Sequence, residues 1–147
     1  MITAVALLLA GFYAYLELTH PRCETVSVLR AKEMIGIDPS LVILDIRTEE
    51  EYAEGHIEGA INIPLEELEQ RLDELDRERA ILVYCWSGVR SERACEMLIE
   101  SGFRKVYNME GGISAWMSAG YPIVTRTQAT VEHHEDLASS LTLSRFP

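Results

Sequence analysis

The chain has 147 residues, of which 48% are hydrophobic and 25% are charged, a composition typical of a folded globular protein and not of a disordered one. Its 13 Lys and Arg stand against 24 Asp and Glu, and the formal net charge of -11 repels nucleic acid and anionic lipid headgroups at long range. No nucleic-acid partner is therefore expected, whereas a small anionic substrate held by local groups remains compatible with this charge.

The first predicted element is the apolar run Ile2–Leu16, within residues 1–20. Such a helix is somewhat shorter than the roughly 30 Å hydrocarbon core, which suits a short membrane anchor or the core of a signal peptide. Because no Lys or Arg precedes the run and no clear cleavage site follows it, we expect an uncleaved anchor. Arg22, Arg30 and Lys32 favour the cytoplasmic side for the globular part, with an exported or periplasmic domain as the alternative. A helix packed on the domain itself is a further interpretation.

From residue 26 onward, short apolar strands alternate with amphipathic helices, as in a parallel sheet covered on both faces. The predicted fold class is α/β, with one domain over residues 21–123 and a central five-stranded parallel sheet between two helical layers. Strands are expected at Thr25–Val28, Val42–Asp45, Ala60–Asn62, Ala80–Tyr84 and Lys105–Asn108. Helices are expected at Leu29–Ile35, Thr48–Glu54, Leu65–Leu75, Gly88–Ser101 and Ile113–Ala119.

Two glycines are expected to end helices in the left-handed conformation, Gly55 and Gly102. The periodicity is lost after Pro122, so residues 124–147 are expected to form a polar, flexible tail. His133 and His134 lie in this tail, where a solvated segment is a simpler interpretation than a pair of metal ligands. No metal site and no cofactor are predicted.

A thiol stands at the turn between the fourth predicted strand and the helix after it. The strand Ala80–Tyr84 leads directly into Cys85, and the loop Cys85–Arg90 leads into the helix. In an open parallel sheet, ligands collect at the carboxyl ends of the strands. Cys85 is therefore the candidate nucleophile.

The neighbours of Cys85 favour its anionic form. A helix N-terminus, inward-pointing loop amides and a nearby Arg all lower the pKa of a thiol from its usual value near ~8.5. Gly88 allows the loop to bend, and Arg90 can hold two oxygens of a small oxyanion. The alternative, an inert cysteine buried at a strand end, is disfavoured because Ser87, Gly88 and Arg90 are polar or expose backbone.

Four other side chains near this edge of the sheet are weighed as supporting groups. Asp45 and Arg47 follow a neighbouring strand and could steer substrate, although a structural ion pair explains them more simply. His56, between Gly55 and Ile57, is expected to be a hydrogen-bonded structural residue. Trp86 either shapes the mouth of the pocket or contacts a protein that accepts the product.

The remaining cysteines are widely spaced, and three cysteines are too few for a disulfide framework. Cys95, on the helix after the active loop, is expected to be packed, and Cys23 to be a free thiol. A resolving-cysteine role for either one is the weaker alternative.

Three separate stretches resemble landmarks of the rhodanese-like sulfurtransferases. The first is the loop Cys85–Arg90, and the second is Leu44-Asp45-Ile46-Arg47 followed by Glu51-Tyr52 and by Gly55-His56-Ile57-Glu58-Gly59-Ala60-Ile61-Asn62-Ile63-Pro64. The third is Gly111-Gly112-Ile113-Ser114-Ala115-Trp116. A single Cys-x-x-Gly-x-Arg would be weak evidence, but the order and spacing of the three stretches over Val26–Pro122 are specific in combination.

The resemblance implies a small rhodanese-like α/β domain in which Cys85 accepts a sulfane sulfur from an anionic donor such as thiosulfate. The resulting persulfide would pass its sulfur to cyanide or to a thiol, including a thiol on a protein. Arg90 would hold the anionic end of the donor, and the amides of Trp86, Ser87, Gly88 and Val89 would stabilise the thiolate and then the persulfide.

Two other functions are considered. The same fold could serve as a sulfur-relay or protein-binding module without turnover. A related class of phosphatases and arsenate reductases uses a similar loop with one more residue between Cys and Arg. The four residues between Cys85 and Arg90 enclose a smaller ring of amides, which suits one sulfur atom better than phosphate or arsenate.

Overall fold

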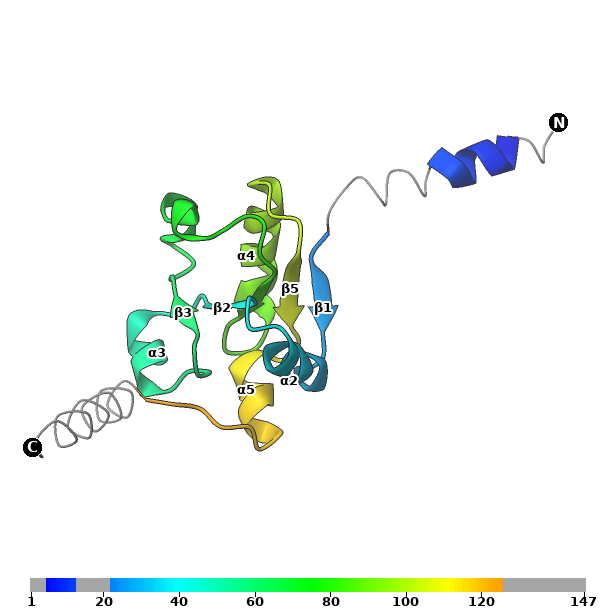
Figure 1. The fold of residues 1–147 in the computed structure, drawn as a ribbon. Helices are drawn as coiled ribbons and strands as arrows, with labels where there is room; N and C mark the ends of the chain where they lie inside the picture. Colours follow the sequence, from blue (N-terminus) through cyan, green and yellow to red (C-terminus); the bar gives the residue numbers. More distant parts are fainter. Residues whose placement is uncertain (1–4, 13–21, 126–147) are drawn as a thin grey trace, which may run out of the picture.

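The computed structural model describes residues 5–12 and 22–125, and most of the second range forms a parallel sheet covered by helices on both sides (Figure 1). The five strands are β1 (Glu24–Val26), β2 (Val42–Asp45), β3 (Ile61–Asn62), β4 (Ile81–Tyr84) and β5 (Val106–Met109). The α-helices are α2 (Val28–Ile37), α3 (Glu49–Glu54), α4 (Val89–Glu100) and α5 (Gly112–Ser118), and two 3-10 helices are η1 (Leu68–Gln70) and η2 (Leu72–Glu74).

The strands lie in the order β1-β5-β4-β2-β3, and every pair is parallel. The sheet is centred on β4, where Val83 lies opposite Leu44 of β2 on one side and Asn108 of β5 on the other. The predicted fold class and the five-stranded parallel sheet are confirmed. Because β4 is the central strand, the residue after its last position lies in the middle of the carboxyl edge, and that residue is Cys85.

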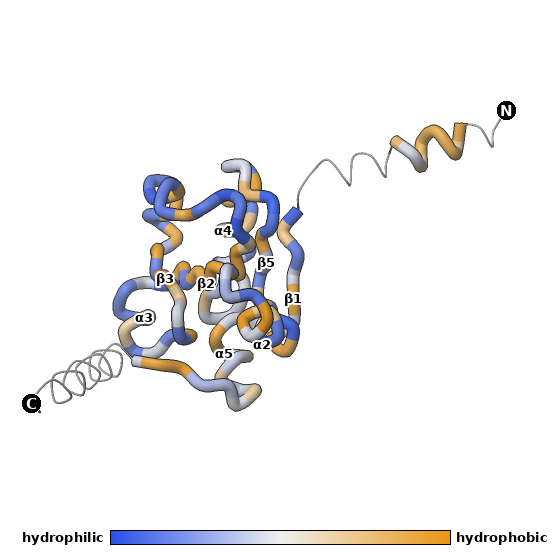
Figure 2. The backbone as a smooth tube through the Cα atoms, viewed as in Figure 1, coloured by the Kyte–Doolittle hydropathy of each residue, from blue (hydrophilic) through white to orange (hydrophobic). Residues whose placement is uncertain are grey.

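Alternate residues of β4 enter two different hydrophobic cores, because successive side chains of a strand point to opposite faces. Ile81 and Val83 pack with Ala94 and Leu98 of α4. Leu82 packs on the other face with Ala31 of α2 and with residues of α5. Hydrophobic stretches therefore gather around the sheet, and the outer turns are mostly hydrophilic (Figure 2). These two cores fix β4, and with it the start of α4.

The segment predicted as one helix over Leu65–Leu75 is instead a pair of short 3-10 helices. Buried Leu68 and Leu75 attach both ends of the segment to the core that contains α4. On the exposed side of the segment, the guanidinium of Arg71 forms ion pairs with Glu67 and Glu74, which lie before and after it in sequence. Tertiary contacts at these points override the local helical pattern.

Of the two glycines expected to be left-handed, only Gly102 is so, with φ of 92°. Gly55 is extended, with φ of 164° and ψ of 135°. The chain leaves α3 at this point in an extended form because the next residue, His56, forms an antiparallel bridge with Val124.

The prediction of a membrane anchor, and with it the placement of the domain at a membrane, is wrong. Across residues 5–12 and 22–125, every helix is too short or too polar to cross a bilayer. Residues 5–12 are helical. The other parts of the predicted segment, residues 1–4 and 13–20, lie outside the described residues. So do residues 126–147 of the predicted tail, with His133 and His134.

Candidate active site

Cys85 lies between the central strand β4 and helix α4, at the start of a loop that bends back over its sulfur. Gly88 makes this bend possible, since its φ of 94° is one that side chains with a Cβ rarely adopt. The residue Cys85 is fully buried, whereas Trp86 and Val89 on the same loop are 49% and 72% exposed. The thiol therefore sits at the bottom of a site whose rim carries apolar side chains.

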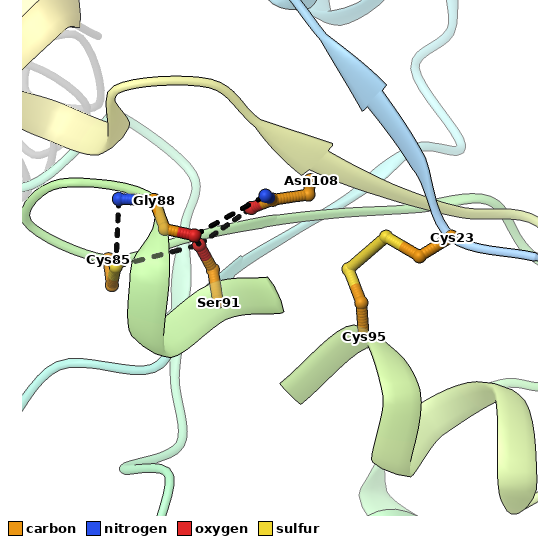
Figure 3. Close-up of a disulfide and its surroundings, with 6 residues drawn as sticks. All are labelled: Cys23, Cys85, Gly88, Ser91, Cys95 and Asn108. Carbon is orange, nitrogen blue, oxygen red and sulfur yellow. Dashed lines mark hydrogen bonds between the residues drawn. A yellow bond between two sulfur atoms is a disulfide. The ribbon is translucent and has the colours of Figure 1, made fainter. Parts of the chain in front are cut away.

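Two hydrogen-bond donors reach the sulfur of Cys85 (Figure 3). The backbone N–H of Gly88 lies 3.1 Å from Sγ, and the hydroxyl of Ser91 lies 3.5 Å from it. Burial acts to raise the pKa of the Cys85 thiol. The Ser91 hydroxyl and the backbone N–H groups of Ser91, Ser87 and Gly88 outweigh burial, so the pKa of Cys85 lies below its usual value. The site favours a thiolate.

Ser91 and Asn108 form a buried polar pair behind the loop that sequence reasoning missed. The Ser91 hydroxyl has one proton and three acceptors within reach: the side-chain oxygen of Asn108 at 2.6 Å, the carbonyl oxygen of Gly88 at 3.0 Å and Sγ of Cys85 at 3.5 Å. It donates to one of them at a time. The amide nitrogen of Asn108 donates to that same carbonyl at 3.3 Å. Ser91 directly follows the loop, but only the pairing of β5 with β4 brings Asn108 to it, and no local pattern encodes that pairing.

The start of α5 holds the backbone of the active loop. The N–H of Ile113 donates to the carbonyl of Cys85 at 2.8 Å, and the N–H of Ser114 donates to the carbonyl of Trp86 at 3.1 Å. Gly112 lies so close that a Cβ atom would collide with the carbonyl oxygens of Cys85 and Trp86. Gly112 thus has a direct steric role, because it lets α5 approach the loop.

Arg90, predicted to bind the donor, forms a two-bond ion pair with Glu51 of α3. Its two terminal nitrogens donate to the Glu51 carboxylate oxygens at 2.9 and 2.7 Å. The Arg90 hydrogen bonds lower the pKa of Glu51 to about 2. The same pairing raises the pKa of Arg90, to which the nearby Cys85 sulfur also contributes. The sequence placed Arg90 at the site but gave no sign that Glu51 would meet it.

Asp45 and Arg47 form a buried ion pair at the same edge of the sheet. Nε of Arg47 donates to both carboxylate oxygens of Asp45, at 3.0 and 3.1 Å. A terminal nitrogen of Arg47 donates to the carbonyl of Gly55 at 2.7 Å, which joins the pair to the end of α3. Burial tends to lower the pKa of Arg47, but Asp45 raises it overall. Both groups are used by these internal contacts, so a direct role in substrate binding stays a prediction.

His56 is another residue that the sequence singled out. A ring nitrogen of His56 lies 2.9 Å from the carbonyl oxygen of Tyr52, and the two rings stack at 3.7 Å. His56 is thus the hydrogen-bonded structural residue expected. Among residues 5–12 and 22–125, no group of three His, Cys, Asp or Glu is arranged to hold a metal ion.

Cys23 and Cys95 form a disulfide, which corrects the expectation that Cys23 is a free thiol (Figure 3). Their Cα atoms are 5.7 Å apart although 72 positions separate them in sequence. The pairing of β1 with β5 brings Cys23 beside α4, a long-range contact that cysteine spacing does not encode. Of the three cysteines, only Cys85 is free.

Comparison with known proteins decides the family. Residues 27–119, more than half of the chain, match the Rhodanese-like domain family. The chain belongs to that family. The match contains the active loop, Glu51, the Asp45–Arg47 pair and the glycines at the start of α5.

Individual relatives are consistent with this assignment. The chain is 40% identical over 84 residues to a sulfurtransferase of Allochromatium vinosum, covering 57% of this chain and 78% of that protein. It is 34% identical over 93 residues to a thiosulfate sulfurtransferase of Coxiella burnetii, covering 63% and 86%. A rhodanese-related protein from Thermoplasma volcanium has a crystal structure similar to this domain, with a TM-score of 0.63 and 35% identity, covering 69% of this chain and 97% of that one.

Proposed function

We propose that this rhodanese-like domain is a sulfurtransferase that carries a sulfane sulfur on Cys85. The Cys85 thiolate attacks the outer sulfur of a donor such as thiosulfate, and a new S–S bond forms while sulfite leaves with the electron pair of the broken bond. The persulfide then passes its outer sulfur to cyanide, giving thiocyanate, or to a thiolate, giving a new persulfide. Either acceptor regenerates the Cys85 thiolate.

The observation that carries this proposal is the pair of donors at the sulfur of Cys85. The Gly88 amide and the Ser91 hydroxyl reach Sγ at 3.1 and 3.5 Å and favour the anion, which is the nucleophilic form of cysteine. Donors fixed around a negative charge also suit the persulfide anion that follows. Such a site needs no general base, because the thiolate is already present.

The size of the loop favours sulfur over phosphate or arsenate. Four residues, Trp86 to Val89, separate Cys85 from Arg90, and the loop closes tightly enough for the Gly88 amide to reach Sγ directly. The relatives at 34% and 40% identity are named as sulfurtransferases, which supports the same choice.

A mass spectrum of the intact chain tests the proposal. Incubation with thiosulfate is expected to add about 32 Da, one sulfur atom, to Cys85, and subsequent cyanide should remove it while thiocyanate appears. Cys85→Ser should gain nothing. An adduct that cyanide and thiols fail to remove would point instead to a binding module without turnover. Absence of any adduct with thiosulfate and with other sulfane donors would reject sulfur transfer through Cys85.

A further inference from the structure

Arg90 already has an anionic partner before any donor arrives. The Glu51 carboxylate takes two hydrogen bonds from the two terminal nitrogens of Arg90, at 2.9 and 2.7 Å. The two side chains are only 39% and 30% exposed, so the pair is partly shielded from water. This is the arrangement in which a guanidinium would otherwise hold two oxygens of a donor.

The Glu51 carboxylate is held in place by its own helix. Glu51 is the third residue of α3, and its Oε2 accepts the backbone N–H of Thr48 at 3.1 Å, while the Thr48 hydroxyl accepts the N–H of Glu51. This reciprocal pair is a capping box, which fixes both the start of the helix and the acid at its third position. A donor therefore meets a fixed carboxylate and has to draw Arg90 away from it or bind beside it.

The charge at this side of the site is balanced or negative. Glu51 cancels the charge of Arg90, and the exposed Glu66 also lies close enough to interact with Arg90 electrostatically. Cys85 itself adds a negative charge when it is a thiolate. A donor with two negative charges, such as thiosulfate, thus meets more repulsion here than a donor with one.

We propose that Glu51 is a specificity-determining residue whose carboxylate competes with the oxyanion of the donor for Arg90, so that the site discriminates against dianionic sulfur donors in favour of monoanionic ones. This inference rests on the proposed sulfurtransferase function. The favoured class includes thiosulfonates, anions of the form RSO2S⁻ that carry one negative charge in total. Attack by the Cys85 thiolate on a thiosulfonate forms the same persulfide and releases a sulfinate.

The test is Glu51→Gln, assayed with thiosulfate and with methanethiosulfonate. Glutamine can keep the capping box at this position but removes the charge that holds Arg90. The KM for thiosulfate is expected to fall about two- to fivefold, the size of effect typical of a partly exposed ion pair. The KM for methanethiosulfonate should change less, and kcat should change little with either donor.

Two controls separate competition from a general structural effect. Thr48→Ala weakens the cap but leaves the Glu51 carboxylate facing Arg90, so the ratio of the two KM values should stay that of the unaltered chain even where thermal stability falls. In an Arg90→Ala background, Glu51→Gln should lower the KM for thiosulfate by a smaller factor, because only charge repulsion and no competition for Arg90 is then relieved. An unchanged or raised KM in Glu51→Gln overturns the inference.

The unaltered chain supplies a measurement that does not depend on how any variant folds. Its KM for methanethiosulfonate should be equal to or below its KM for thiosulfate, and a KM many-fold lower for thiosulfate would contradict the competition. If Cys85 forms a persulfide but these ratios fail, only the role of Glu51 is lost. If no persulfide forms with either donor, the proposed function itself is lost.

Discussion

At the scale of single residues, the state of Cys85 depends on a contest between burial and hydrogen bonding. Full burial alone would keep the thiol protonated, because desolvation penalises the charged form. The Ser91 hydroxyl contributes the largest opposing effect, followed by the loop amides. A side chain that sequence reasoning passed over therefore helps to lower the pKa of the proposed nucleophile.

Ser91→Ala is expected to raise the pKa of Cys85, because it removes a donor to the thiolate and leaves burial unchanged. The rate of persulfide formation at pH 7 should fall about tenfold, the loss expected for one hydrogen bond to a charged group. At higher pH the rate should recover, since a raised pKa shifts the pH profile of the rate to higher pH. Stopped-flow measurement of sulfite release against pH would follow this shift.

Ser87→Ala is the matched control, because Ser87 is exposed and acts on Cys85 through its backbone amide, which alanine retains. Its pH profile should overlay that of the unaltered chain. A Ser91→Ala profile equal to both would remove Ser91 from the account of the thiolate.

The sequence separation of the contacts explains which residues of the site could be predicted. Cys85, Gly88 and Arg90 lie close together in sequence, between the end of β4 and the first turn of α4, so local sequence was enough to select them. Glu51 and Asn108 reach the site only through helix α3 and strand β5, and those contacts span 39 and 17 positions of sequence. Such contacts are set by the packing of the whole sheet.

At the scale of elements, the strands β2 and β4 were found within one residue because both are fully buried and, apart from Asp45 at the end of β2, built from apolar or aromatic residues. The helix predicted at Leu65–Leu75 was wrong, since its leucines are spaced as in a helix but are held by contacts with distant residues. Local periodicity thus locates an element well where one regular pattern fills it. Such a pattern is less informative where a segment is attached to the core at a few points.

The disulfide between Cys23 and Cys95 ties the start of β1 to α4, the helix that follows the active loop. Cys23→Ser together with Cys95→Ser is expected to lower the free energy of unfolding by about 2 to 4 kcal/mol, because a cross-link over a long loop restricts the unfolded chain. Urea unfolding of the two proteins would measure the difference. Addition of dithiothreitol should lower the stability of the unaltered chain by a similar amount.

Cys85→Ser serves as the control, because Cys85 takes no part in the cross-link. Its response to dithiothreitol should match that of the unaltered chain. A double serine variant that unfolds at the same urea concentration as the unaltered chain would show that the cross-link contributes nothing to stability.

At the scale of the whole molecule, the alternation of strands and helices was sufficient to predict a parallel sheet with helices on both faces. The order β1-β5-β4-β2-β3 is not contained in that alternation, and it determines that Cys85 follows the central strand. The expected membrane anchor was wrong for another reason: it was inferred from the apolar composition of one run, and no helix within residues 5–12 and 22–125 is long and apolar enough to cross a membrane.

The overall charge of -11 and the local charge of the site act at different distances. Acidic groups far from Cys85 are screened by salt beyond about 10 Å, whereas Arg90, Glu51 and the loop amides act at contact. An acidic protein can therefore hold a thiolate and approach anionic donors, provided that the contacts around the sulfur outweigh the distant repulsion.

The most direct test of this account is a titration of Cys85 by the ultraviolet absorbance of the thiolate. Because Cys23 and Cys95 are joined in a disulfide, Cys85 is the only thiol that can contribute to the signal. We expect a midpoint below the usual value of about 8.5, with the signal absent from Cys85→Ser. A midpoint at or above that value would mean that burial prevails over the Gly88 and Ser91 donors, and Cys85 would then lack the anion on which sulfur transfer depends.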